Sequence, residues 1–268
     1  MRHSPPQHPQ FYVTAPQDCP YLENKVERKL FTALYGSNSS RLNNSLSKQG
    51  FRRSQNVLYR PSCSNCTACM SARIPSKDFS PSKSQKRILS KNKDIVRTIN
   101  PPLATDPQFE LFKNYINKRH SNGGMSDMDS DDFTSMIEET NVESKLIEYY
   151  IKRNSTLELV SFSLVDILDD GISMVYSVFD PELSDRSLGT YMILDHSNLA
   201  LEMNLEFVYL GYWVKGSSKM DYKRRFSPLE VFTNDKWTCA SKSKITKIVS
   251  DKHDQQKHGV PIYLPSEE

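Results

Sequence analysis

Residues 172–179 read ISMVYSVF and residues 207–214 read FVYLGYWV, two apolar stretches rich in β-branched and aromatic side chains. Short apolar runs of this composition are typical of buried strands. Between them, residues 188–203 carry apolar side chains at helical spacing, namely Ile193, Leu194, Leu199, Ala200 and Met203. The order strand, helix, strand therefore predicts a βαβ unit.

The chain on either side of this unit predicts further strands and helices. Residues 142–151 and 156–168 predict strands that reach the unit through the turn Asp169-Asp170-Gly171. We expect a domain boundary near Asn100-Pro101-Pro102, because consecutive prolines end a strand or a helix. The expected division is an N-terminal domain at 1–100, a second domain at 101–240 and a polar tail at 241–268. Helices are predicted at 23–34, 40–49, 81–91, 109–119 and 128–138, and strands at 51–59, 72–74 and 95–99.

The composition is that of a folded protein with a polar surface. Of the 268 residues, 37% are hydrophobic and 25% are charged, and the mean hydropathy is −0.60. The longest apolar runs fall short of the roughly 18 residues that a transmembrane helix needs. The first ten residues are polar and broken by proline, unlike a signal peptide, so we expect a cytoplasmic protein without a membrane partner.

Four of the five cysteines lie in the first 69 residues. Cys63, Cys66 and Cys69 follow one another at three-residue steps, and Cys19 is a distant fourth sulfur. Thiolates at this spacing suit Zn²⁺ or an iron–sulfur cluster. The alternative is a set of small, buried, reduced thiols, and the spacing leaves both open. Cys239 lies far from the other cysteines in the sequence, and we expect it to be an ordinary thiol.

Positive charge is concentrated between residues 51 and 97. This segment holds eleven Lys and Arg against two Asp, an excess of nine, whereas the whole chain carries only +3. Such an excess indicates a polyanionic partner, because phosphate contacts release counterions and steer the encounter. A solvated basic face is the alternative.

Two motifs in the first domain interleave aromatic and basic residues: Phe51-Arg52-Arg53 and Tyr59-Arg60-Pro61. Arginine can hold a phosphate or a carboxylate through two N–H bonds, and aromatic rings can stack on bases. An ordinary strand with an exposed basic face is the alternative. His120 beside a glycine loop is a candidate base, with a surface or capping role as its alternative.

The helix of the βαβ unit opens with Arg186-Ser187-Leu188-Gly189-Thr190. This string resembles the R/Q-x-x-G-x-G/A turn of GNAT-type N-acyltransferases, although Tyr191 replaces the last small residue. Backbone N–H groups at such a helix start can hold phosphate or stabilise an oxyanion. An ordinary helix N-terminus after an Asp-Pro turn is the alternative.

Together these strings resemble the arginyl/leucyl-tRNA–protein transferase family from about residue 10 to about residue 238. Leu22 stands where the eukaryotic, arginine-transferring branch has a second cysteine, so the resemblance is to the bacterial aspartate/glutamate leucyltransferase branch. The matching strings are Gln10-Phe11-Tyr12, Cys19-Pro20-Tyr21-Leu22, Gly50-Phe51-Arg52-Arg53-Ser54-Gln55, Tyr59-Arg60-Pro61, Cys63-x-x-Cys66-x-Ala68-Cys69, Tyr115-x5-Ser121-x-Gly123-Gly124-Met125, Ser187-Leu188-Gly189-Thr190-Tyr191, Tyr209-Leu210-Gly211-Tyr212-Trp213-Val214, Lys219-Met220-x-Tyr222-Lys223 and Phe226-x-Pro228.

The resemblance implies an α+β protein, with a cysteine-containing N-terminal domain followed by a GNAT-like acyltransferase domain. It implies transfer of leucine from Leu-tRNA to the N-terminal Asp or Glu of an acceptor protein, which creates a degradation signal. The reaction requires no cofactor, although zinc or an iron–sulfur cluster at the cysteines stays open. The alternatives are arginine transfer, an acetyl-CoA-dependent GNAT enzyme and a non-catalytic RNA-binding module.

The resemblance also assigns expected site residues. Gly189, Thr190 and Tyr209 are the expected catalytic residues, with N–H groups of the first two directed at the tRNA 3′ end or the oxyanion. Arg52, Arg53 and Lys219 are expected to hold the acceptor's carboxylate, and Tyr212 and Trp213 to line a leucyl pocket beside Tyr209. Expected tRNA contacts are Lys86, Arg87, Lys91 and Lys93, and expected metal ligands are Cys19, Cys63, Cys66 and Cys69.

Overall fold

The computed structural model describes residues 9–119, 123–240, 262 and 264 and divides into two compact units. Unit 1 comprises residues 1–73 and 210–268, and unit 2 comprises residues 74–209. In the part of the chain that the structure describes, no helix has both the length and the apolar character to cross a membrane. The polar tail expected at 241–268 lies almost entirely outside the described residues.

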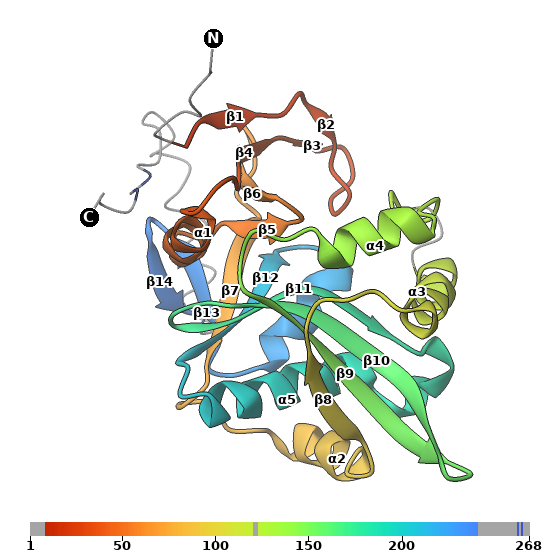
Figure 1. Ribbon diagram of the computed structural model, residues 1–268. Helices are drawn as coiled ribbons and strands as arrows, with labels where there is room; N and C mark the ends of the chain where they lie inside the picture. Colours follow the sequence, from red (N-terminus) through yellow and green to blue (C-terminus); the bar gives the residue numbers. More distant parts are fainter. Residues whose placement is uncertain (1–8, 120–122, 241–261, 263, 265–268) are drawn as a thin grey trace. The chain divides into compact units, whose positions relative to one another are not determined.

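Unit 2 is built on a mixed sheet with the strand order β12-β11-β10-β9-β8 (Figure 1). Neighbours from β8 to β11 are antiparallel, whereas β11 and β12 are parallel, because the helix α5 crosses over between them. This confirms the predicted strand–helix–strand unit. The bounds are β8 (Val96–Asn100), β9 (Ser144–Arg153), β10 (Thr156–Ile167), β11 (Gly171–Phe179), α5 (Leu188–Glu202) and β12 (Phe207–Val214), whose residues 207–209 belong to unit 2.

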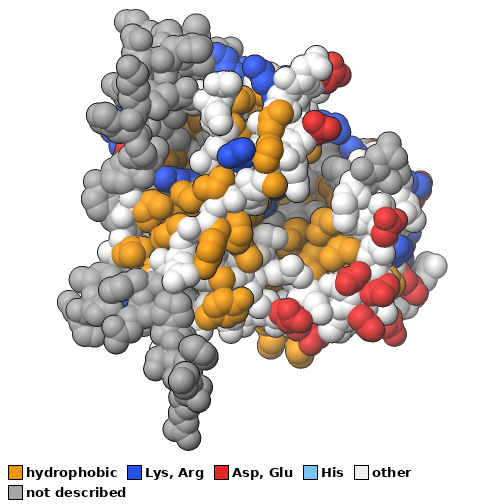
Figure 2. Space-filling model, turned by 90° about the horizontal axis from the view of Figure 1, so that it is seen from above, with side chains coloured by type: hydrophobic (Ala, Val, Ile, Leu, Met, Phe, Trp, Pro, Cys, Tyr) orange, Lys and Arg blue, Asp and Glu red, His pale blue; other side chains and the backbone are white. Residues whose placement is uncertain are grey.

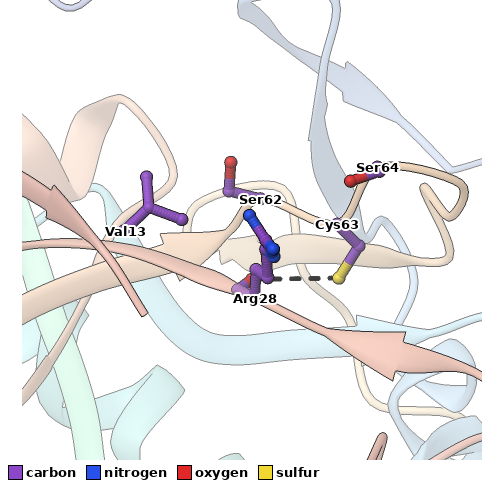
Figure 3. A pocket seen from close by; sticks show the side chains of 5 residues that line it. All are labelled: Val13, Arg28, Ser62, Cys63 and Ser64. Carbon is purple, nitrogen blue, oxygen red and sulfur yellow. Dashed lines mark hydrogen bonds between the residues drawn. The ribbon is translucent and has the colours of Figure 1, made fainter. Parts of the chain in front are cut away.

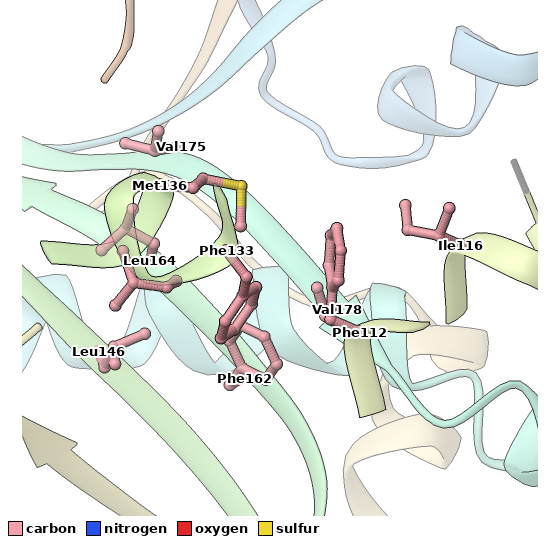
Figure 4. Close-up of a cluster of buried hydrophobic side chains, with 10 residues drawn as sticks. Phe112, Ile116, Phe133, Met136, Leu146, Phe162, Leu164, Val175 and Val178 are labelled. Carbon is pink, nitrogen blue, oxygen red and sulfur yellow. The ribbon is translucent and has the colours of Figure 1, made fainter. Parts of the chain in front are cut away.

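One face of this sheet is covered by α3 (Asp106–Arg119) and α4 (Ser130–Glu138) (Figure 1). The helices bury Phe112 and Phe133 among the apolar side chains of β9, β10 and β11, and the two rings lie 5.1 Å apart (Figure 4). Asp129 caps α4 through its carboxylate, which accepts the N–H of Asp131 and Asp132. Acidic side chains gather on one side of the face shown in Figure 2.

The opposite face of the sheet carries α5, and α2 (Lys83–Lys91) packs beside that helix (Figure 1). Successive residues of a strand point to opposite faces. Tyr149 of β9 accordingly reaches α5, where its hydroxyl donates to Asp195, while its neighbour Glu148 accepts from Gln108 of α3. A capping box formed by Ser82 and Gln85 fixes the start of α2.

Unit 1 contains a four-stranded sheet of order β1-β4-β6-β5 and the two-stranded pair β2-β3. It also contains β7, whose residues up to Arg73 belong to this unit and pair with the hairpin β13-β14. The bounds are β1 (Phe11–Val13), β2 (Gln17–Asp18), β3 (Val26–Glu27), β4 (Lys29–Ala33), α1 (Ser39–Lys48), β5 (Arg52–Ser54), β6 (Val57–Pro61), β7 (Cys69–Pro75), η2 (Ser218–Arg225), β13 (Glu230–Thr233) and β14 (Lys236–Cys239).

The helix predicted at 23–34 is wrong, because this segment forms β3 and β4. Apolar spacing was compatible with a helix there, but β4 pairs on one side with β1 and on the other with β6. Tertiary strand pairing thus overrides local spacing. The division at residue 73 also differs from the boundary expected near residue 100, because β8 pairs with β9 and α2 packs against α5.

Candidate functional site

A cavity of about 680 Å³ opens within unit 1. Its walls come from the loop 19–27, from β4 and β6, from the cysteine-bearing loop 62–69, from β12 and from the β13–β14 turn. This volume lies within the range of small-ligand sites. We refer to it as the unit 1 cavity.

Tyr212 forms a fixed part of the cavity wall. Its hydroxyl lies 2.8 Å from the carbonyl oxygen of Tyr59 and 3.2 Å from that of Gly50, and its ring tilts against the ring of Tyr59. Burial raises the pKa of Tyr212 well above its usual value. The side chain is therefore a neutral, anchored surface. Its predicted neighbour Trp213 is almost fully buried and does not line the cavity.

All four clustered cysteines line the unit 1 cavity: Cys19, Cys63, Cys66 and Cys69. Burial, reinforced by the nearby thiols, raises the pKa of Cys69 to about 12, so this thiol stays protonated. Among the described residues, however, no group of three or more His, Cys, Asp or Glu side chains is arranged to hold a metal ion. The observed arrangement does not form a metal-ligand set, and metal binding stays a prediction from the sequence.

Cys63 also borders a second, open cavity of about 470 Å³, shown in Figure 3. Its thiol donates to the carbonyl oxygen of Arg28 at 3.8 Å, and Val13, Ser62 and Ser64 complete the lining. Burial raises the pKa of Cys63 as well. This thiol is therefore held by the main chain rather than activated as a nucleophile.

Arg52 and Arg53 alternate faces along β5, as predicted for adjacent residues of a strand. Arg53 is 2% exposed, and its Nη1 donates to the carbonyl oxygen of Gln55 at 2.8 Å. Arg52 is half-buried, with Nη1 3.5 Å from the carbonyl oxygen of Leu210. Neither arginine lines the cavity, and Lys219 is exposed on η2. Their contact with the acceptor stays a prediction from the sequence.

Arg60 on β6 does line the cavity, although the residues expected from the sequence to hold the acceptor's carboxylate were Arg52, Arg53 and Lys219. Its guanidinium lies over the ring of Phe51, 4.8 Å from the centroid. Burial lowers the pKa of Arg60, which Asp235 partly opposes. The motif Tyr59-Arg60-Pro61 marked this residue, but only the structure places it at a cavity wall.

In unit 2, the predicted catalytic residues Gly189 and Thr190 lie at the start of α5. Ser187 adopts the left-handed conformation with φ of 53°, and the N–H of Thr190 donates to the Ser187 carbonyl oxygen at 2.9 Å. The N–H of Thr190 is therefore already engaged within the helix start. A Cβ on Gly189 would lie 3.1 Å from the Phe179 ring, so a larger residue there would require that ring to shift. The hydroxyl of Tyr209 donates to Asp170 at 2.9 Å.

The predicted tRNA contacts lie on or just after α2, and all are exposed. Lys91 forms an ion pair with Asp185 of η1 (Pro181–Arg186) at 2.7 Å. Lys86, Arg87 and Lys93 form no ion pair with any other residue of the described chain. Acids from elsewhere in unit 2 thus neutralise part of the basic segment.

A buried polar cluster in α5 was not predicted. His196 is fully buried, and burial lowers its pKa to about 4, so the imidazole is neutral. Its neighbour Asp195 accepts from Tyr149 at 2.9 Å and from Arg97 at 3.2 Å. His120, the candidate base from the sequence, lies outside the described residues.

Comparisons with known proteins agree on one family. Family models described as the N terminus and the C terminus of arginine-tRNA-protein transferase match residues 17–87 and 107–233. A Ruegeria pomeroyi protein named aspartate/glutamate leucyltransferase is 58% identical over 237 residues, which cover 88% of this chain and 86% of that protein. The chain belongs to this family of transferases. A protein of the same name from Cereibacter sphaeroides is 55% identical, covering 88% of this chain and 85% of the other.

The family matches reach both units. The N-terminal match includes Arg60 and all four clustered cysteines, and the C-terminal match includes Tyr212 and the start of α5. A solved C-terminal domain of a putative lysylphosphatidylglycerol synthetase from Agrobacterium fabrum aligns with a TM-score of 0.44 at 11% identity, covering 73% of this chain and 67% of the other. Similarity this low supports no conclusion about the fold. The family assignment rests on the sequence matches, and it makes the chain a transferase.

Proposed function

We propose that this protein transfers leucine from Leu-tRNA to the N-terminal Asp or Glu of acceptor proteins, and so marks them for degradation. The observation that carries this proposal is the 58% identity, over most of both chains, to a protein named aspartate/glutamate leucyltransferase. Charged tRNA and acceptor proteins are then its partners, and the cytoplasm, where charged tRNA is made, is its place of action.

The reaction requires little from the protein beyond orientation of the aminoacyl ester and the acceptor amine. An aminoacyl ester is already activated, and an N-terminal amine with a pKa near 7.7–8.0 is partly neutral near pH 7. Holding ester and amine together can supply roughly 7–11 kcal/mol of the barrier. We assign unit 2 the role of a GNAT-like acyltransferase core, because its parallel pair β11–β12 is joined by α5 with Gly189 at the helix start. No covalent nucleophile is required.

The test is a matrix of donors and acceptors. The protein is incubated with labelled Leu-tRNA or Arg-tRNA and with peptides that begin with Asp, Glu, Asn or Lys. We expect leucine to be transferred to the Asp and Glu peptides only. No product with any pair, under conditions in which a characterised relative is active, would refute transferase function.

Arginine is the second candidate donor, because the matching family models carry the name of the arginine enzyme. The same matrix separates the two. An arginine product formed as fast as the leucine product would overturn the leucine assignment and leave the transferase family intact.

A further inference from the structure

Arg60 is a half-buried cation on the wall of the unit 1 cavity, and no acid among the described residues contacts its guanidinium. Within the described ranges 9–119 and 123–240, its guanidinium makes no ion pair and no hydrogen bond. One face of the guanidinium lies over the Phe51 ring, 4.8 Å from the centroid. Taking a charge partly out of water is unfavourable unless an opposite charge meets it. A ligand that brings a carboxylate or a phosphate would provide that charge.

The other cations of the cavity differ from Arg60. Lys29 is paired with Glu27 at 3.0 Å and also lies near the Tyr59 ring. Lys25 is exposed, so water satisfies it. Of the cations that line this cavity in the described chain, Arg60 is thus the one that is both half-buried and without a contacting acid. Its planar fork of N–H donors matches a carboxylate in two-point contact.

The same cavity also presents negative charge. Glu27 lines it, and Asp235 lines it from the turn between β13 and β14. Asn234 and Asp235 form that turn with φ of 51° and 57°, the two positive values of a type I′ hairpin turn. The short turn holds the Asp235 carboxylate at the cavity. A wall with both a cation and carboxylates complements a ligand that carries both charges.

We propose that the unit 1 cavity binds the acceptor's N-terminal residue, with Arg60 holding its side-chain carboxylate and Asp235 facing its α-ammonium group. This inference rests on the proposed function and names the acceptor subsite within it. An N-terminal Asp or Glu carries both of the required charges, whereas Asn or Gln lacks the negative one. An arginine reads charge and tolerates the one-methylene difference between Asp and Glu.

A tRNA phosphate is the competing ligand for Arg60. Lys29 pairs with Glu27, but the Asp235 carboxylate lines the same cavity and would repel a phosphate brought close to it. Because Asp235 lines the cavity without an ion-pair partner in the described chain, the cavity offers an α-ammonium group a contact that a phosphate cannot use. Removing the Arg60 charge distinguishes the two ligands. A carboxylate contact predicts weaker binding of the acceptor, and a phosphate contact predicts weaker binding of Leu-tRNA.

The experiment compares Arg60→Met and Arg60→Lys with Arg153→Met. Methionine keeps an unbranched stem over Phe51 and removes the charge, and lysine keeps the charge without the fork. Arg153 is an exposed arginine of unit 2, paired with Glu158, and serves as the matched control. Two readouts are needed: kcat/KM for the Asp, Glu and Asn peptides, and direct binding of a fluorescent Asp-initiated peptide without tRNA.

We expect Arg60→Met to lower kcat/KM for Asp and Glu peptides about 10- to 100-fold, the scale of a hydrogen bond to a charged group. The preference for Asp over Asn should fall toward one, while KM for Leu-tRNA stays within about twofold. Arg60→Lys should recover part of the loss, and Asp235→Asn should weaken binding of the free amine but not of its acetylated form. The Arg153→Met control should match the parent.

Three results would overturn the proposal. One is parental use of Asp and Glu peptides by Arg60→Met. Another is a raised KM for Leu-tRNA with the acceptor unaffected, which would make Arg60 a phosphate contact. The third is loss of peptide binding in Arg60→Lys equal to that in Arg60→Met, with both variants folded by circular dichroism. If no tRNA supports transfer, the peptide-binding assay still tests the cavity, so the failure of the proposed function is distinguishable.

Discussion

Gly211 holds β12 in an unusual conformation, and its replacement by alanine is the sharpest stability test in unit 1. Its φ is +70°, and a Cβ built there would overlap Nη1 of Arg52. On either side, the Leu210 and Tyr212 carbonyl oxygens accept from the Nζ of Lys223 at 2.8 and 2.6 Å. The buried lysine thus fixes the backbone on both flanks of Gly211, so a Cβ there would be accommodated by displacing the Arg52 guanidinium.

The expected cost of Gly211→Ala has two parts. A left-handed conformation costs a residue with a Cβ about 1–2 kcal/mol. Displacing the Arg52 guanidinium from the Leu210 carbonyl adds about 1.5–3 kcal/mol, the scale of a hydrogen bond involving a charged group. The expected loss of unfolding free energy is therefore about 2.5–5 kcal/mol. Gly36 is a matched control, because its φ is +73° but a Cβ there would meet nothing within 4 Å.

Urea unfolding of four variants tests this account: Gly36→Ala, Gly211→Ala, Arg52→Ala and the double variant of the last two. Gly36→Ala should lose only the conformational part, about 1–2 kcal/mol. In the Arg52→Ala background, Gly211→Ala should also fall to about that value, because the overlap is gone. The double-mutant cycle then yields a coupling of at least about 1 kcal/mol. Equal losses at Gly36 and Gly211, or additive effects in the cycle, would refute the steric argument.

Two further predictions concern unit 2. Because the folded pKa of His196 is lowered to about 4, below its unfolded value near 6.5, the unfolded chain binds the proton first. The part of the unfolding free energy that depends on neutral His196 should therefore be fully present above about pH 6.5. It should fall by about 3 kcal/mol by pH 4, at 1.36 kcal/mol per pKa unit. His196→Gln should remove this part of the slope, and an unchanged urea-midpoint profile would contradict it. Charge reversal of Lys86, Arg87 and Lys93 should raise KM for Leu-tRNA. It should also reduce the slope of log affinity against log salt concentration by about 2–3, whereas reversal of the already paired Lys91 should change the slope less. An unchanged slope would contradict tRNA contact at these residues.

The parts of the fold that the sequence predicted are those in which local pattern and tertiary burial agree. The apolar strands β11 and β12 and the helix α5 were expected because their side chains are buried on both faces of a layer. The prediction of a helix at residues 23–34 was wrong because local pattern and tertiary pairing disagree there. Its apolar spacing fits a helix, but strand partners on both sides decide its conformation, and they are remote in sequence.

The cation at the candidate site shows a similar limit. Strand alternation predicts that Arg52 and Arg53 point to opposite faces, and their contacts differ accordingly. Alternation does not show which face borders a cavity, or which guanidinium already donates to a carbonyl. That depends on β12 and on the β13–β14 turn, both from the far end of the chain. Arg60 therefore emerged only from the three-dimensional lining of the cavity, although its motif had been noted.

The basic segment illustrates the same point for charge. Counting residues gives an excess of nine between 51 and 97, but charge acts through space. Arg97 contacts Asp195 and Glu202, and Lys91 pairs with Asp185, so acids from η1 and α5 offset part of the count. Any attraction of a polyanion by this part of unit 2 therefore depends on the exposed cations that have no such partner. Counting only partners in the described part of the chain, the predicted contacts on α2 and just beyond it that meet this condition are Lys86, Arg87 and Lys93.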